Sequence, residues 1–244
     1  MSDSLVINEI YLSLQGESTF AGLPCVFIRL TACNLRCSYC DSAYAFKEGK
    51  RMRSEEVHAE VTRLAAGYAT TGTRFRLPLV ELTGGEPLLQ KSAVPFMRSL
   101  CDQGFTVLLE TSGAHDIAPV DSRVRRIMDL KCPSSGEVAR NRWQNVPHLK
   151  QTDEVKFVIG TVEDYEWAKQ ILTEYNLAAI CPVLFSWVAP LSDHQRDSSL
   201  KPVPEGQHSL TRIELVERII ADRLPVRFQL QMHKFIWPPD ERGV

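Results

Sequence analysis

The stretch that decides the fold reads TACNLRCSYCD, residues 31–41, and carries thiols at Cys33, Cys37 and Cys40. It follows directly on an apolar run over residues 26–30, which is typical of a buried strand. Thiolates spaced in this way can wrap one compact iron–sulfur centre. Because only three cysteines are local, a [4Fe–4S] cluster held here would keep one iron without a protein ligand, as a catalytic metal site requires.

Two other kinds of metal site remain open on spacing alone. A structural zinc ion takes four ligands, so it would need a distant fourth one, and the next histidine, His58, lies beyond the start of a predicted helix. A cluster that only transfers electrons would normally have a fourth cysteine. The presence of three local thiols therefore favours a catalytic cluster.

The remaining cysteines are dispersed along the chain at Cys25, Cys101, Cys132 and Cys181. The total of seven is odd, and most of the four lie in apolar contexts, which argues against a disulfide framework. We predict that they are small core side chains.

Composition places the chain among ordinary globular proteins. It has 244 residues, of which 44% are hydrophobic and 24% charged, and the net charge is −2. Nothing in this balance suggests a basic face for nucleic acid. The first residues lack the pattern of a signal peptide, and no apolar run reaches the length of a membrane span. We therefore expect a cytoplasmic protein that binds neither nucleic acid nor membrane.

Short apolar runs alternate with segments of helical periodicity. The runs predict strands at 26–30, 79–82, 105–109, 126–130, 154–159, 178–184 and 226–230. The helical segments are 55–66, with Ser54 as its cap, 92–102, 162–175, where Thr161 and Asp164 form a capping pair, and 210–221. This order predicts an α/β fold with mostly parallel strands.

Six or seven strands are too few for a closed barrel of eight. We therefore predict an open, partial TIM-like barrel, with a doubly wound sheet as the alternative. Residues 1–244 form one domain in this prediction, with a cluster loop at 31–46 and a polar surface loop near 192–209.

Polar segments follow three of the predicted strands. They are Thr83–Pro87, with the sequence TGGEP, Glu110–Gly113, with the sequence ETSG, and Asp129–Lys131, with the sequence DLK. Ligands gather at the carboxyl ends of parallel strands, so we expect these segments to lie close together around one site.

The TGGEP segment has a physical logic of its own. Glycines let a ligand approach the backbone closely, and Glu86 offers an acceptor for an ammonium group. Alone, this segment could be a turn into a helix. Together with the three cysteines and with Tyr39 just before the last of them, it resembles the radical S-adenosylmethionine (SAM) superfamily, in which SAM binds the open iron. The resemblance implies a radical SAM core.

Flanking segments narrow the resemblance. The N-terminal INEIYLSLQGES, the CDS at residues 40–42, the segment DLKCPSSG at 129–136 and the ending QMHKF at 231–235 are similar to the 7-carboxy-7-deazaguanine synthase family. The resemblance covers most of the chain. It implies a radical ring contraction of 6-carboxy-5,6,7,8-tetrahydropterin to 7-carboxy-7-deazaguanine with loss of ammonia, in the pathway to 7-deazapurines such as queuosine. It also implies a [4Fe–4S] cluster, SAM that is regenerated, and Mg²⁺ as cofactors.

Roles carry over by position from the resemblance. The implied substrate-binding residues are Leu14, Gln15, Gly16, Glu17, Arg29 and Thr83, and the implied SAM-binding residues are Tyr39, Asp41, Gly85, Glu86, Asp129, Leu130 and Lys131. Ser42 stands where the family commonly has a threonine that binds Mg²⁺, so it keeps the hydroxyl and loses the methyl. Arg29 suits the substrate carboxylate, with a structural ion pair as the alternative. We expect Glu17 to pair with the guanidine-like edge of the pterin.

The resemblance further implies a homodimer and a flavodoxin-type electron donor. Two rival functions remain. One is a radical SAM activase of a glycyl-radical enzyme, and the other is an iron–sulfur redox module without catalysis. The proline-rich tail from Trp237 to Val244 has no assigned role, and it could cap the substrate pocket or a dimer interface.

Overall fold

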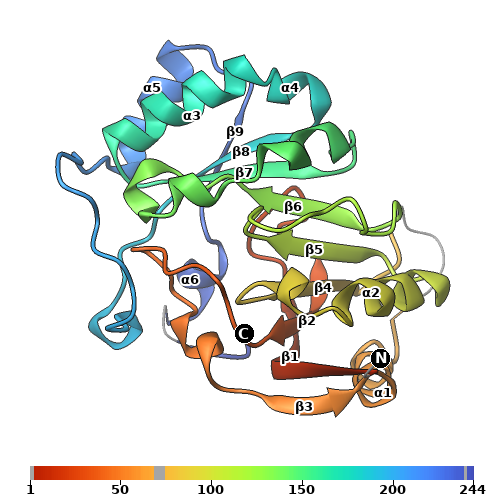
Figure 1. The fold of residues 1–244 in the computed structure, drawn as a ribbon. Helices are drawn as coiled ribbons and strands as arrows, with labels where there is room; N and C mark the ends of the chain where they lie inside the picture. The colour runs from red at the N-terminus through yellow and green to blue at the C-terminus, as the bar shows by residue number, and fades with distance from the viewer. Residues whose placement is uncertain (1–2, 69–74, 239–240) are drawn as a thin grey trace.

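The computed structural model describes residues 3–68, 75–238 and 241–244, and these form one curved sheet with helices packed outside it (Figure 1). The strands are β1 (Ser4–Leu14), β2 (Pro24–Leu30), β3 (Lys50–Arg53), β4 (Leu79–Gly84), β5 (Val107–Thr111), β6 (Arg125–Asp129), β7 (Glu154–Ile159), β8 (Val183–Trp187) and β9 (Arg227–Gln229). Their order in the sheet is β3-β1-β2-β4-β5-β6-β7-β8-β9.

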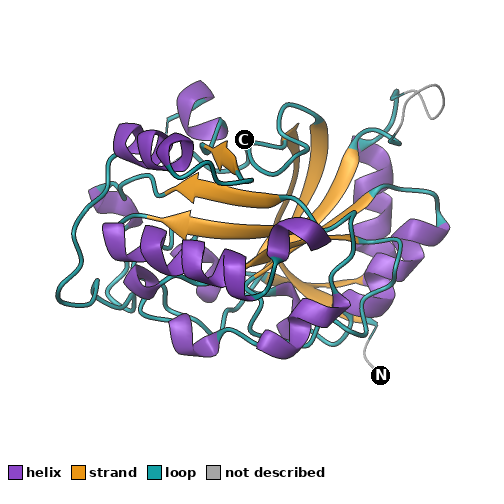
Figure 2. Ribbon diagram, turned by 90° about the horizontal axis from the view of Figure 1, so that it is seen from above, coloured by secondary structure: helices purple, strands orange, loops and turns teal. Residues whose placement is uncertain are grey.

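The sheet is parallel from β2 to β9, while β1 runs antiparallel to both β2 and β3. Strands β3 and β9 are its two edges, so the barrel does not close. Figure 2 shows the curvature from above. The prediction of an open, partial barrel is confirmed, and the carboxyl ends of the parallel strands gather at one end.

The helices are α1 (Ser54–Leu64), α2 (Ala93–Asp102), α3 (Val162–Glu174), α4 (Leu177–Ile180), α5 (Arg212–Ala221) and α6 (His233–Ile236). Short 3-10 turns lie at Ala43–Phe46, Pro87–Leu89, Pro133–Ser135, Val138–Arg140, Trp143–His148 and Asp193–Gln195. In the part of the chain that the structure describes, no helix combines the length and the apolar character that crossing a membrane demands.

Side chains alternate between the two faces of each strand, as strand geometry requires. On β4, Val80 and Leu82 point outward and pack with Phe96 and Met97 of α2 in one core cluster. The alternate residues Glu81 and Thr83 point inward and line a cavity. The curved sheet therefore has an apolar outer wall and a polar inner wall.

A second outer core lies under α3 and α5. Val155, Phe157 and Ile159 of β7 pack there with Tyr165 of α3 and Leu215 of α5. A smaller cluster fills the bottom of the barrel, where Tyr11 and Phe27 stack with ring centroids 5.1 Å apart. The four dispersed cysteines are confirmed as core residues, since all are buried: Cys25, Cys101, Cys132 and Cys181.

Several predicted boundaries were wrong. Strands β1 and β3 were missed. The first half of the strand predicted at 178–184 is helix α4, because Asn176 adopts a left-handed conformation that ends α3, and the strand starts only at Val183, after Pro182. Ser54 is the first helical residue of α1 rather than its cap, which is Arg53.

The capping pair predicted for α3 is confirmed. Thr161 Oγ1 accepts a hydrogen bond from the Asp164 backbone N–H at 3.1 Å, and the Asp164 carboxylate accepts one from the Thr161 N–H at 3.2 Å. Replacing Thr161 with alanine should lower the free energy of unfolding by about 1–2 kcal/mol, because a buried cap is lost. Denaturant titration measures this. The control Thr173→Ala, exposed on the same helix, should change stability by less than about 0.5 kcal/mol.

Candidate active site

A cavity of about 570 Å³ opens at the carboxyl ends of the parallel strands. This volume lies in the usual range for small-molecule sites. Its lining contains the three clustered cysteines and most of the other residues predicted for the site: Leu14, Gln15, Gly16, Glu17, Arg29, Tyr39, Asp41, Ser42, Thr83, Gly85, Asp129 and Lys131. Segments far apart in the sequence thus meet around one space.

Glu86 and Leu130 do not line this cavity. Glu86 is fully buried, and its carboxylate accepts hydrogen bonds from Leu88 N (2.9 Å), from Thr111 Oγ1 (2.9 Å) and from Ser112 N (2.7 Å). In the structure this carboxylate joins the TGGEP turn to the ETSG segment, and its contact with the ammonium group of SAM stays a prediction.

The TGGEP turn packs directly on the cluster loop through its backbone. The N–H of Gly85 donates to Leu30 O at 3.0 Å, and the N–H of Glu86 donates to Ala32 O at 2.8 Å. A Cβ atom on Gly85 would collide with the backbone of Ala32 and Cys33. Glycine is therefore required for this close approach.

Replacing Gly85 with alanine should displace the cluster loop, because the colliding atoms are backbone and cannot swing away. We expect the iron content after anaerobic reconstitution to fall at least about threefold, since a 1 Å misplacement in a site typically has a large effect. The control Gly206→Ala has open space around its Cβ position. It should cost some stability through its positive φ and leave the iron content unchanged. Equal iron content in both variants would contradict the packing argument.

The cluster loop is fixed from the segment that follows β6. The Arg36 N–H donates to Glu137 Oε1 at 2.7 Å, and Ser38 Oγ donates to Ser134 O at 2.7 Å. Lys201, from the long polar loop, donates its N–H to Arg36 O at 3.0 Å and pairs with Glu137 at 2.9 Å. Hydrogen bonds to Ser134, to Glu137 and to Lys201 thereby fix the loop that bears the cysteines.

The three thiols suit an iron–sulfur cube. None of them forms a disulfide, and all three face the cavity. Among the described residues, no three His, Cys, Asp or Glu side chains converge closely enough for one metal ion. A cube takes one thiolate at each of three corners, so its ligands stand further apart than those of a single zinc ion. Burial raises the pKa of Cys40 to about 12, so this thiolate forms as iron binds.

Arg29 lies on β2, just before the cluster loop, and is held by side chains of β1. Its Nε donates to Glu9 Oε1 at 2.7 Å, and its Nη2 donates to Tyr11 Oη at 2.9 Å. Burial opposes its charge, but Tyr11, Tyr44 and Glu9 raise the pKa of Arg29 overall. The guanidinium therefore stays charged, and its remaining N–H groups are available to an anion in the cavity.

Gln15 is held from both ends of its amide. Its Nε2 donates to Glu81 Oε2, and its Oε1 accepts from the Glu17 N–H at 2.7 Å. Burial raises the pKa of Glu81 well above its usual value, and the charge of Glu110 adds to this. The side chain of Gln15 thus shapes the loop, and sequence reasoning missed Glu81 as its partner.

Asp41 and Ser42 lie next to each other at the end of the cluster loop. Ser42 Oγ lies 3.4 Å from Asp41 Oδ1, while Asp41 Oδ2 accepts from Lys234 Nζ at 2.6 Å and from Gln231 Nε2 at 3.2 Å. Although burial opposes ionisation, Lys234 lowers the pKa of Asp41. Mg²⁺ prefers such oxygen ligands, and the Ser42 hydroxyl with a neighbouring carboxylate fits it as part of a hydrated site.

The C-terminal part of the chain closes the open side of the barrel. The Met232 N–H donates to Gly16 O at 2.9 Å. Residues 241–244 line the cavity, and the Arg242 guanidinium lies 3.8 Å from the centre of the Tyr44 ring. Of the proline-rich tail, Pro239 and Asp240 lie outside the described residues. Residues 194–197 of the polar loop near 192–209 also line the cavity, while most of this loop is exposed.

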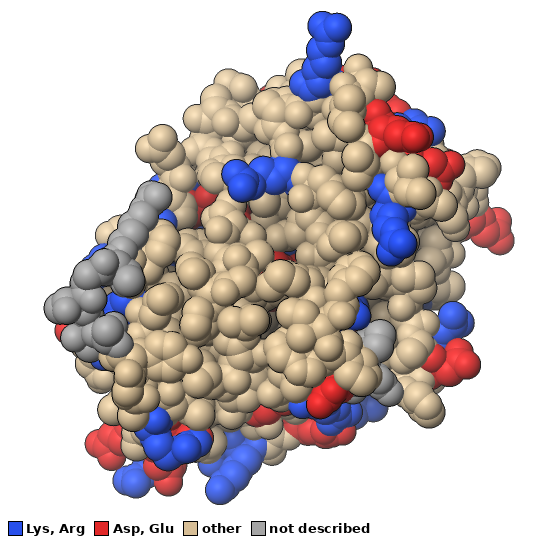
Figure 3. Space-filling view, turned by 180° about the vertical axis from the view of Figure 1, so that it is seen from behind, with Lys and Arg blue, Asp and Glu red and all other residues tan. Residues whose placement is uncertain are grey.

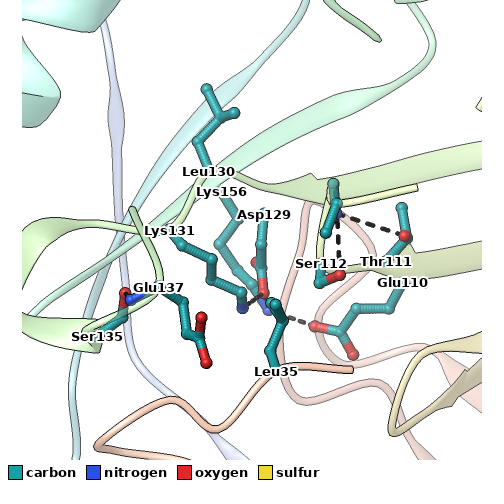
Figure 4. A network of polar contacts seen from close by, with 12 residues as sticks. Leu35, Glu110, Thr111, Ser112, Asp129, Leu130, Lys131, Ser135, Glu137 and Lys156 are labelled. Carbon is teal, nitrogen blue, oxygen red and sulfur yellow. Dashed lines mark hydrogen bonds and ion pairs between the residues drawn. The ribbon is translucent and has the colours of Figure 1, made fainter. Parts of the chain in front are cut away.

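A network of charged side chains from β5, β6 and β7 forms part of the cavity wall (Figure 4). Asp129 pairs with Lys131, and Lys156 of β7 pairs with Glu110 and with Asp129, the latter at 3.5 Å. Thr83 Oγ1 donates to the other oxygen of Glu110 at 2.9 Å. Lys156 was not predicted, because a single lysine inside an apolar strand carries no motif.

The outer surface differs from this charged interior. Figure 3 shows the face turned away from the viewer in Figure 1, where Lys and Arg side chains are scattered among uncharged residues. That face lacks the continuous basic stripe that binding to phosphate backbones requires.

Comparisons with known proteins match this geometry. The model of the radical SAM superfamily matches residues 27–134. A 7-carboxy-7-deazaguanine synthase of Koribacter versatilis is 44% identical over 98% of this chain and 99% of its own length. One from Chlorobaculum tepidum is 40% identical over 98% of this chain and 97% of its own length. The crystal structure of QueE from Escherichia coli superposes with a TM-score of 0.68 at 21% identity, covering 94% of this chain and 95% of that one.

Proposed function

Because the chain belongs to the 7-carboxy-7-deazaguanine synthase family of radical SAM enzymes, we propose that it converts 6-carboxy-5,6,7,8-tetrahydropterin to 7-carboxy-7-deazaguanine. Loss of ammonia accounts for the whole change in composition, so the reaction needs no net oxidant or reductant. The product serves the biosynthesis of 7-deazapurines such as queuosine.

One observation supports this proposal most directly. A single cavity brings the three cysteines together with Arg29 and Thr83, which come from different strands. A carboxylated, flat substrate needs a cation for its carboxylate and hydrogen-bonding groups for its ring, and the inner wall offers both. In this proposal the main task of the protein is to hold SAM and the pterin substrate next to each other in the correct orientation.

The cluster and SAM, when bound, supply the radical that abstracts hydrogen from C6 of the substrate. Cys33, Cys37 and Cys40 hold the cluster in this proposal. The residues that contact SAM in this proposal are Tyr39, Asp41, Gly85, Glu86, Asp129, Leu130 and Lys131.

On the substrate side, Arg29 binds the carboxylate in a charge-assisted pair. Leu14, Gln15, Gly16 and Thr83 contact the ring. Glu17 is tied to Lys156 and Gln231, and it keeps a partly exposed carboxylate for the pterin edge. The Ser42 hydroxyl is a ligand of Mg²⁺ in this proposal, and Mg²⁺ orients the substrate and offsets the charge of its carboxylate.

The rival functions fit the site less well. An activase would have to admit a backbone glycine of another protein, whereas this cavity is lined by buried carboxylates and Arg29, which suit a small charged molecule. A redox module without catalysis would not need a cavity next to the cluster loop. For the finer points, we propose a cytoplasmic homodimer reduced by a flavodoxin-type donor, on the strength of the family alone.

The decisive experiment is anaerobic reconstitution with iron and sulfide, followed by reduction and addition of SAM, Mg²⁺ and 6-carboxytetrahydropterin. Formation of 7-carboxy-7-deazaguanine is expected by chromatography and mass spectrometry. Release of 5′-deoxyadenosine without this product would refute the proposed substrate. Absence of both products in a protein with full iron content would refute the radical reaction.

A further inference from the structure

Lys156 is the buried cation at the centre of the inner wall, and the roles given above leave it without a task. It lies on β7, and its side chain is 5% exposed. Its neighbours Val155 and Phe157 point outward into the apolar core, so strand alternation turns Lys156 toward the cavity. A lysine buried so deeply is costly unless carboxylates surround it.

Three carboxylates from three different segments surround this ammonium. Nζ lies 3.0 Å from Oε2 of Glu17 in the loop after β1, 3.5 Å from Oδ1 of Asp129 at the end of β6, and closer still to Oε1 of Glu110 on β5. Glu17 belongs to the substrate side, and Asp129 to the SAM side. Lys156 is thus a direct link between the two halves of the site.

The carboxylates are more exposed than the ammonium that holds them. Their side chains are 19% exposed in Glu17, 28% in Glu110 and 11% in Asp129, against 5% in Lys156. The ammonium therefore lies behind them and holds one oxygen of each carboxylate at the cavity wall.

Each carboxylate also has a second partner. Gln231 binds Glu17 at 3.0 Å, Thr83 binds Glu110 at 2.9 Å, and Lys131 binds Asp129. Although burial opposes ionisation, Lys156 lowers the pKa of Glu17, and Lys131 with Lys156 lowers that of Asp129. Lys156 fixes the position of each carboxylate, and these second partners fix its orientation. A shift of Lys156 would therefore displace Glu17 on the substrate side and Asp129 on the SAM side.

We propose that Lys156 is a positioning residue that keeps Glu17 on the substrate side in register with Asp129 on the SAM side, with Glu110, the partner of Thr83, between them. The inference rests on the proposed function, because register matters only if a radical formed on one side must reach a carbon on the other. Loss of register lets SAM be cleaved while the substrate is badly placed. The consequence is uncoupling: the 5′-deoxyadenosyl radical takes its hydrogen from the reductant or the buffer instead of from C6, so methionine and 5′-deoxyadenosine are released without product and the external reductant supplies both electrons.

The test compares Lys156→Met and Lys156→Arg with wild type. The first readout is the amount of 5′-deoxyadenosine released per 7-carboxy-7-deazaguanine formed, and the second is the affinity for that product by calorimetry without turnover. Lys156→Met should raise the ratio at least tenfold and weaken product binding at least tenfold. Lys156→Arg keeps the positive charge but moves it. It should therefore raise the ratio about threefold, to a value between those of wild type and Lys156→Met.

Arg126→Met is the matched control. Arg126 is a buried cation on the adjacent β6, it pairs with Asp153 at 2.5 Å, and it does not line the cavity. This variant should lose thermal stability and keep the wild-type ratio of the two products. An equal rise of the ratio in Arg126→Met would show general destabilisation and overturn the proposal.

A wild-type ratio and affinity in folded Lys156→Met would overturn it as well. If Lys156→Met does not fold, an unchanged ratio in Lys156→Arg has the same force. Failure of the wild-type protein to form 7-carboxy-7-deazaguanine would instead refute the proposed function. The two failures are therefore distinguishable.

Discussion

Replacing Cys37 with alanine is expected to abolish cluster assembly and with it all turnover. The thiol faces the cavity between Cys33 and Cys40, and no other cysteine in the described residues lines that space. With two thiolates left, the cube loses a corner ligand that nothing nearby can replace. Iron and sulfide analysis together with the EPR signal of the reduced protein measure the loss, and product formation should fall below detection.

The matched control for this prediction is Cys132→Ala. Cys132 is fully buried beside the same site, and its thiol packs in the outer core rather than in the cavity. Its loss should cost about 1 kcal/mol of stability through a small void. Iron content should stay at the wild-type value. Full iron content in Cys37→Ala, or its loss in Cys132→Ala alone, would contradict the ligand assignment.

Replacing Arg29 with methionine should reduce kcat/KM for the pterin by roughly 30- to 5,000-fold. The estimate corresponds to about 2–5 kcal/mol for removing one partner of a buried charge pair. The substrate carboxylate would lose its cation, and Glu9, now 2.7 Å from Arg29 Nε, would be left as an uncompensated negative charge. Steady-state kinetics measure the change, which we expect mainly in KM.

Binding of SAM to the reconstituted Arg29→Met protein should remain within about twofold of wild type, because Arg29 lies on the substrate side. Arg125→Met is a control on another strand, since Arg125 packs on Phe20 and Phe75 outside the cavity. It should leave KM unchanged. Selective loss of SAM binding in Arg29→Met would refute the role assigned to Arg29.

Short sequence patterns predicted the features of this fold that depend on neighbouring residues. The cysteine loop, the glycine turn and the capping pair at Thr161 each depend on residues close in sequence. Strand β1 was missed for a physical reason. Leu5 and Ile7 pack in the outer core, but the pairing of the strand shifts register between Ile7 and Glu9, and beyond this irregularity Tyr11 lines the polar cavity. The strand therefore lacks a continuous apolar run.

Contacts between distant segments lay beyond sequence reasoning. Lys156 meets Glu17, which is 139 residues away, and Glu110, which is 46 residues away. Glu86 illustrates the same limit. The motif identified the residue, but only the fold brings Thr111 and Ser112 to its carboxylate. Such pairings depend on which strands become neighbours.

The alternation of side chains on β4 has a practical consequence for protein engineering. Val80 and Leu82 belong to the outer wall, whereas Glu81 and Thr83 belong to the inner wall. Thermostabilising libraries can therefore be restricted to the outer positions and to the facing side of α2, where substitutions alter packing alone. Libraries aimed at altered substrates would use the intervening positions. Thermostability and substrate specificity can thus be evolved separately, on alternate residues of one strand.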